Sequence, residues 1–95
     1  MITLTAPLKV WSNDEGRMHY LSVPDEMSGE IRAHSLEMPR GFGSVRVEVT
    51  LAGVTWRTSV FPVKSGGYFL PVKVDVCRKT GIAEGDEVSV KLELL

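Results

Sequence analysis

Residues 61–95 read FPVKSGGYFLPVKVDVCRKTGIAEGDEVSVKLELL, and this stretch decides the fold of the chain. Its Lys-Ser-Gly-Gly sequence at 64–67 predicts a turn between one strand and a second, short strand at 68–72. Residues 87–94 alternate strictly between polar and apolar side chains, which predicts a final half-buried strand. The stretch therefore indicates a sheet built from short, sequential strands.

A short helix is predicted at residues 75–80, between the second strand and the last one. Asp75 can cap its N-terminus through a side-chain hydrogen bond, and Gly81 can take the left-handed conformation that commonly ends a helix. Ile82 is expected to fill one end of the core, and Gly-Asp at 85–86 predicts the turn that starts the final strand. These constraints are architectural, so they indicate a fold rather than an activity.

Residues 44–61 give the clearest strand pairing of the chain. Apolar positions alternate on both sides of a central Ala-Gly dipeptide, which predicts two strands joined by a two-residue turn. In that register Val49 lies opposite Trp56 on the buried side. Glu48 then lies opposite Arg57 on the exposed side, and the agreement of both faces supports the register.

The N-terminal region predicts a second hairpin. Residues 2–10 alternate as one half-buried strand, and residues 17–23 form the strand that pairs with it. Pro7 lies on the outward-facing set of the first strand and has no N–H to donate. The strand should therefore be at an edge of the sheet there, or carry a bulge.

A helix is predicted at residues 24–33, where Pro24 suits a first helical position and the following acidic residues suit a helix N-terminus. Met27 and Ile31 are four residues apart and should face the core together. Residues 34–43 should be a connector.

Together these elements amount to about six short strands and one or two short helices. A chain of this size with six strands leaves fewer exposed edges if the sheet curls into a barrel. We therefore expect a mainly β fold, a small closed or partly open antiparallel β-barrel, in a single domain over residues 1–95.

The composition restricts the class of function. The chain has 11 basic and 12 acidic residues, for a formal net charge of −1. Nucleic-acid-binding proteins usually carry a basic surplus, so the composition disfavours nucleic acid as a partner without excluding it. One cysteine excludes an internal disulfide, and no apolar run suits a signal peptide or a membrane helix. We expect a cytoplasmic protein that does not contact a membrane.

The segment RKTGIAEGDEV at residues 78–88, with Gly-Gly-Tyr at 66–68 before it and residues 90–93 after it, resembles a known family. It is similar to the bacterial domain of unknown function numbered 1905, and the resemblance is closest from Gly43 onward. Members of that family often carry a second, C-terminal domain of the bacteriocin-protection type. We expect a stand-alone copy without that domain, so functions tied to it do not carry over.

The same segment also resembles, more loosely, the AbrB-type swapped-hairpin barrels. Those barrels bind DNA as intertwined dimers. The likeness implies an alternative function for this chain, that of a DNA-binding barrel acting as a dimer.

Catalytic chemistry has little support in the residue pattern. His19 and His34 are the two histidines, and their spacing to each other and to Cys77 matches no metal-site motif. Cys77 lies in a predicted short helix, where a lone cysteine usually behaves as a small buried hydrophobic residue. We therefore expect no enzyme, no metal and no cofactor.

One group of side chains is left unexplained by the fold. It comprises four cations and an aromatic residue, which would form a cationic rim if the turn at 64–67 and the helix at 75–80 met at one end of the barrel. The leading hypothesis is a non-enzymatic module that binds a small anionic ligand or a protein partner there. The candidate residues are Lys64, Tyr68, Lys73, Arg78 and Lys79.

Overall fold

The computed structural model describes residues 2–37, 43–64 and 67–95. Over these residues the chain forms seven β-strands and two helices. The predicted connector at 34–43 and turn at 64–67 lie partly outside the described residues. The elements are β1 (Ile2–Pro7), β2 (Lys9–Asn13), β3 (Gly16–Val23), α1 (Asp25–Glu37), β4 (Val45–Leu51), β5 (Val54–Pro62), β6 (Tyr68–Val72), α2 (Val74–Thr80) and β7 (Glu87–Leu94).

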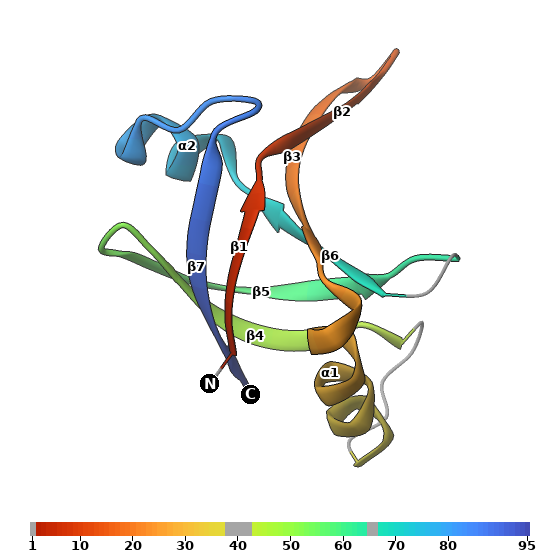
Figure 1. Ribbon diagram of the computed structural model, residues 1–95. Helices are drawn as coiled ribbons and strands as arrows, with labels where there is room; N and C mark the ends of the chain where they lie inside the picture. The colour runs from red at the N-terminus through yellow and green to blue at the C-terminus, as the bar shows by residue number, and fades with distance from the viewer. Residues whose placement is uncertain (1, 38–42, 65–66) are drawn as a thin grey trace.

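The strands form one curled antiparallel sheet in the order β1-β7-β4-β5-β6-β3-β2 (Figure 1). The two edge strands, β1 and β2, follow each other directly in the chain. The sheet therefore curls back on itself into a half-barrel, and its inner face encloses the core. This architecture confirms the predicted partly open antiparallel barrel.

The first predicted strand, residues 2–10, is divided in two. Leu8 lies between β1 and β2, and its backbone bonds to the turn before β7: its N–H donates to the Asp86 carbonyl (2.8 Å) and its carbonyl accepts from the Gly85 N–H (2.8 Å). The first half of the run then pairs with β7 and the second half with β3. The residues that the structure describes thus form seven strands rather than about six. Pro7 ends the edge strand β1, in agreement with its missing N–H.

The predicted central hairpin is confirmed residue for residue. Val49 pairs with Trp56 and Glu48 pairs with Arg57 across β4 and β5. Arg57 Nε donates to Glu48 Oε2 at 3.2 Å on the exposed face. The two-residue turn places Ala52 at φ 48°, in the left-handed region that a residue with a Cβ seldom adopts.

The core is aliphatic and lies inside the curl of the sheet. Valine and leucine side chains from β1, β4, β6 and β7 alternate inward, and α1 adds the fully buried Ile31 with Met27 partly buried beside it. Ile82 is also partly buried against the core, so it packs there without being enclosed. The largest fully buried side chains are Leu4, Leu8, Leu21, Ile31, Leu70 and Leu92.

The helices differ from their predictions at their ends. Helix α1 continues to Glu37, four residues beyond the predicted end. Helix α2 has Lys73 at its N-cap position with no side-chain capping bond, and Asp75 lies in its first turn, so the prediction that Asp75 caps the helix is wrong. Gly81 ends α2 as predicted, at φ 74°, and its N–H donates to the Cys77 carbonyl.

Candidate functional site

The five residues predicted as a cationic rim do not meet at one end of the sheet. Lys64 and Tyr68 lie at the start of β6, whereas Lys73, Arg78 and Lys79 follow its other end, on and before α2. A strand of this length separates its ends by roughly 13 Å. Tyr68 is also buried, at 5 % exposure, so it offers no aromatic surface to a ligand among the cations. The rim was expected because these residues are close in sequence, but β6 carries the chain across the sheet between them.

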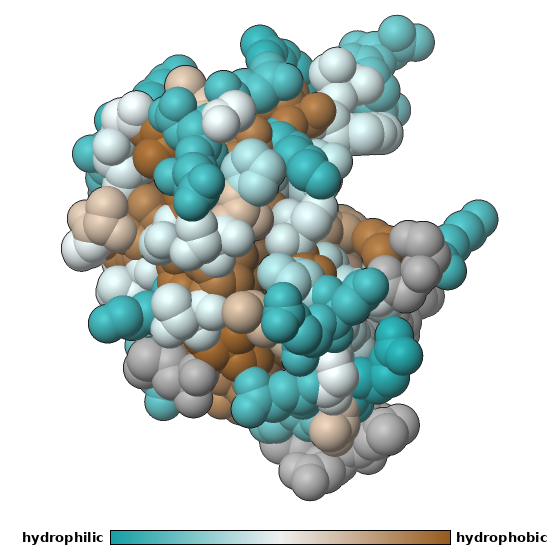
Figure 2. Space-filling model, viewed as in Figure 1, coloured by the Kyte–Doolittle hydropathy of each residue, from teal (hydrophilic) through white to brown (hydrophobic). Residues whose placement is uncertain are grey.

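The structure instead has a groove on the outer face of the sheet, whose lining also includes the core residues Val23 and Tyr68. Its volume is about 620 Å³, and it lies between the projecting β2–β3 hairpin and the end of β5. Figure 2 shows the molecule hollowed at this place, with apolar surface in the wall nearer β5. We call this feature the outer groove. It is lined by Trp11, Met18, Tyr20, Ser22, Val23, Asp25, Val63, Tyr68 and Phe69.

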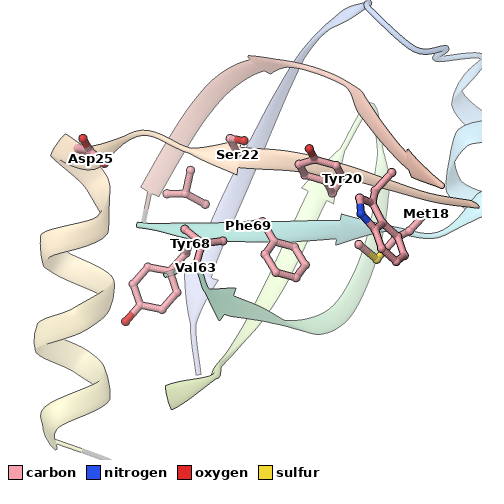
Figure 3. Close-up of a pocket in the computed structure, with 9 residues that line it drawn as sticks. Met18, Tyr20, Ser22, Asp25, Val63, Tyr68 and Phe69 are labelled. Carbon is pink, nitrogen blue, oxygen red and sulfur yellow. The ribbon is translucent and has the colours of Figure 1, made fainter. Parts of the chain in front are cut away.

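Three aromatic side chains on the outer face, those of Tyr20, Phe69 and Phe61, contact one another in a row beside the outer groove. Tyr20 and Phe69, on neighbouring strands, meet edge to face with ring centroids 6.0 Å apart (Figure 3). Phe69 also stacks on Phe61 of β5, at 5.5 Å and 28° between the ring planes. At the hairpin end Trp11 pairs with Met18 across β2 and β3, and 53 % of Trp11 is exposed. Apolar surface thus runs over four strands on the face that does not hold the core.

Strand alternation explains why these side chains face outward. In β3 the buried residues Leu21 and Val23 face the core, so Met18 and Tyr20 must face the other way. In β6, likewise, the buried Leu70 is adjacent to the half-exposed position that faces the groove. The groove is therefore a direct product of a sheet region that is apolar on both faces.

Polar groups are few and lie at defined places in the groove. Ser22 lies in the middle, and its hydroxyl accepts a bond from Lys9 Nζ at 3.3 Å. Asp25, at the start of α1, lies at the end of the groove opposite Met18 (Figure 3). The Asp25 carboxylate is also close to Gly67, because a Cβ on that glycine would lie 3.4 Å from Asp25 Oδ1. The groove therefore has an apolar floor with an acidic group at one end.

Strand β2 forms one border of the outer groove and is an edge strand. It pairs with β3 on one side and has no partner strand on the other within the part of the chain that the structure describes. Its residues are exposed or half-buried throughout. An edge strand presents unpaired backbone N–H and C=O groups, which can pair with another chain. The groove and this free edge lie side by side.

The structure also shows where the cysteine and the two histidines considered from the sequence lie. Cys77 is buried at 8 % exposure, as predicted, and burial raises the pKa of its thiol above the ordinary value. His34 Nε2 donates to the Leu95 carbonyl at 2.8 Å, and His19 lies between Val10 and Val72 in the sheet. Among the described residues no group of histidine, cysteine and carboxylate side chains is placed to hold a metal ion.

The sequence contained a signal for the outer groove that the rim hypothesis did not use. The run Tyr68-Phe69-Leu70-Pro71-Val72 is apolar at every position, whereas a strand with one face in water alternates with polar residues. The pair Met18 and Tyr20 on the outward positions of β3 repeats the signal. What could not be read from the pattern is that β2, β3 and β6 are neighbours, so that these outward residues meet.

Two comparisons with known proteins bear on this site. The family model described as Domain of unknown function (DUF1905) matches residues 5–92. No match is found among curated proteins. The matched range includes every residue that lines the outer groove. No helix of the described residues has the length and apolar character needed to cross a bilayer.

Proposed function

The chain belongs to the DUF1905 family, whose description names no activity, and we propose that it is a non-enzymatic module that binds an extended segment of polypeptide in the outer groove. One observation carries the proposal: a row of aromatic side chains lies beside a free edge strand. The aromatic row supplies contact area, and the edge strand supplies backbone hydrogen bonds.

The aromatic row supports binding because exposed apolar side chains that lie together and are bordered by polar groups often mark interaction sites. Trp11 and Tyr20 are of the residue types that dominate binding energy at protein interfaces. Trp11, at 53 % exposure, is also the most exposed of the large hydrophobic residues that the structure describes. A partner that covered it would remove this surface from water.

A polypeptide fits the site better than a compact ligand because of the free edge of β2. A peptide that adds a strand to a sheet edge takes its affinity from main-chain bonds and its specificity from pockets for alternate side chains. The outer groove lies on one face of the sheet beside that edge. Every second side chain of an added strand would therefore reach toward it.

The burial of Cys77, the nucleophile considered from the sequence, supports the non-enzymatic part of the proposal. Cys77 is buried in α2, and its raised thiol pKa lowers the thiolate fraction at neutral pH. The groove itself is lined by aromatic, aliphatic and hydroxyl side chains with the single carboxylate of Asp25.

The proposal is tested by nuclear magnetic resonance with labelled protein and a library of extended peptides that alternate apolar and polar residues. We expect amide shifts confined to residues 9–11, 18–23 and 68–69, and a loss of affinity of roughly tenfold or more in Trp11→Ala. Thr50→Ala, on the outer face of β4, is the matched control and should bind as the wild type does. Shifts that are absent, or that fall on the β1–β7–β4 face instead, would contradict the proposal.

The same samples test the alternative of a DNA-binding barrel. That function predicts a shift of the protein on duplex DNA that falls steeply as salt is raised. Binding of this kind, with no peptide response in the groove, would replace the proposal with the AbrB-type function.

A further inference from the structure

The free edge of β2 has the length, direction and residue pattern to pair with itself. We propose that the segment bound beside the outer groove is β2 of a second copy of this chain, so that two sheets join in a symmetric antiparallel dimer centred on Trp11. This inference rests on the proposed function, because it names the occupant of the same edge, beside the outer groove. A symmetric pair of this kind uses one surface of each copy twice.

The backbone of β2 determines which groups are free to pair. A two-residue turn, Asp14-Glu15, joins β2 to β3, and Asn13 Oδ1 accepts from the N–H groups of Glu15 and Gly16 at 2.8 and 3.1 Å. In such a hairpin the residues that flank the turn form a hydrogen-bonded pair, and bonded and non-bonded pairs then alternate. Lys9, Trp11 and Asn13 therefore direct their backbone groups toward β3.

Val10 and Ser12 consequently direct their N–H and C=O groups toward the open edge. In an antiparallel pair centred on Trp11, Val10 lies opposite the partner's Ser12, and the partner's Val10 lies opposite Ser12. These are the residues whose backbone groups are free, so both pairs can exchange two hydrogen bonds. An antiparallel pair centred on Trp11 therefore gives hydrogen-bond partners to the free backbone groups of β2 in both copies.

The side chains agree with the same register. Trp11 and the partner's Trp11 form the central non-bonded pair, where cross-strand side chains approach most closely. Two half-exposed tryptophans would thereby cover each other on the groove face. Each indole would also extend the aromatic row of the other copy.

The charges at the two ends of the strand are complementary. Lys9 lies opposite the partner's Asn13, next to the partner's Asp14 at the start of the acidic turn. The symmetry repeats this contact, so a cation meets an acidic turn at both ends. β2 contains no proline and no bulge in its pairing with β3, so two of the devices that can block pairing at an edge are missing from it.

The decisive variant is Ser12→Pro, which removes one free N–H at the edge. Ser12 is exposed, and its N–H is not directed to β3, so proline should leave the hairpin intact. Sedimentation equilibrium should show the wild type passing from monomer to dimer with a dissociation constant on the order of 10–100 µM. Ser12→Pro should weaken the dimer by tenfold or more, whereas the control Ser12→Ala should dimerise as the wild type does. A dimer that Ser12→Pro leaves unchanged overturns the inference.

A charge exchange tests the register. Lys9→Glu should weaken the dimer, because it brings a glutamate next to the partner's Asp14. Adding Asp14→Lys to the same chain should restore it, since the attractive pair is remade with its signs reversed. If the double variant is no stronger than the single one, the register centred on Trp11 is wrong.

Peptide titration separates this inference from the proposed function. A wild type that stays monomeric to about 1 mM but binds peptides in the outer groove overturns the dimer and keeps the binding module. A monomer that also binds no peptide in the groove overturns both. A dimer with the Ser12→Pro and charge-exchange responses supports both.

Discussion

The two halves of the sheet use their outer faces differently. In the half made by β1, β7 and β4, which we call the alternating half, the outward side chains are polar and often form hydrogen bonds with each other. Thr5 and Ser89 share a hydrogen bond at 2.8 Å across β1 and β7, and Thr50 bonds Thr55 at 3.2 Å across β4 and β5. This face needs no partner other than water.

In the half made by β2, β3 and β6, which we call the two-faced half, the outward positions are largely apolar. Tyr20 and Phe69 contact each other there, and Trp11 and Met18 extend the apolar surface to the tip of the hairpin. Folding requires only the inner face of a sheet to be apolar. The comparison therefore separates two uses of hydrophobic residues: those of the alternating half build the core, and the outward ones of the two-faced half are available to bind.

The largest loss of stability should come from a substitution that leaves a cavity in the core of the alternating half. Leu92 is fully buried in β7, between Ile2 and Val49 of the neighbouring strands. Leu92→Ala should lower the free energy of unfolding by about 3 kcal/mol, because it removes buried methyl groups and leaves a cavity. Urea denaturation measures this loss, and Lys91→Ala on the outer face of the same strand should change stability by less than about 0.5 kcal/mol.

The fraction of Leu92→Ala that remains folded should bind peptide as tightly as the wild type does, because the outer groove lies on the other half of the sheet. A variant that loses peptide affinity while it is still folded would break the separation between the two halves.

Much of this fold could be predicted from the sequence, because local patterns and long-range pairing agree in it. The β4–β5 register followed from alternation on both sides of a two-residue turn, and Gly81 followed from the need for a left-handed residue after α2. The division of the first strand could not be predicted in this way. It depends on Leu8 bonding to residues 85–86, which are almost eighty positions away along the chain.

The candidate site was less predictable than the fold, because it depends on which strands are neighbours. Sequence proximity suggested that Lys64 and Arg78 share a rim, yet β6 lies between them. The residues that do converge, such as Trp11 and Phe69, are far apart in the chain. They come together only through the pairing of β2 with β3 and of β3 with β6.

A smaller loss of stability should come from substitutions on the outer face, and the size of this loss should differ between the two halves. Phe69→Ala removes the contacts with Tyr20 and Phe61, and each aromatic pair contributes roughly 0.5–1.5 kcal/mol beyond its buried area, so we expect a loss of about 1–3 kcal/mol. Thr50→Ala on the alternating half removes one exposed hydroxyl bond and should cost less than about 0.5 kcal/mol. Urea denaturation of both variants compares the two faces directly.

Equal losses in Phe69→Ala and Thr50→Ala would mean that the outer aromatic row adds nothing to folding. The outward aromatic residues of the two-faced half would then serve binding alone, and the two halves would differ more clearly in what their outer faces do.

A stabilising change is expected at the turn of the alternating half. Ala52 has φ 48°, a left-handed conformation that costs a residue with a Cβ about 1 kcal/mol, whereas asparagine before glycine suits this type of turn. Ala52→Asn should therefore raise the free energy of unfolding by about 0.5–1 kcal/mol. The measurement is the urea midpoint. Ala83→Asn, in another exposed turn but without a positive φ, is the control and should bring no gain.

The smallest effect is expected from the exposed ion pair of the central hairpin. Arg57 Nε and Glu48 Oε2 are 3.2 Å apart, but 66 % of the Arg57 side chain is exposed, so water and salt screen the attraction. A double-mutant cycle with Glu48→Gln and Arg57→Gln should give a coupling of about 0.3 kcal/mol at low salt, which falls toward zero in about 0.5 M sodium chloride. A coupling above about 1 kcal/mol would show that the outer face helps to set the register. The smaller value is expected because Val49 and Trp56 already oppose each other on the inner face, and a shift by one residue would expose the buried valine to water.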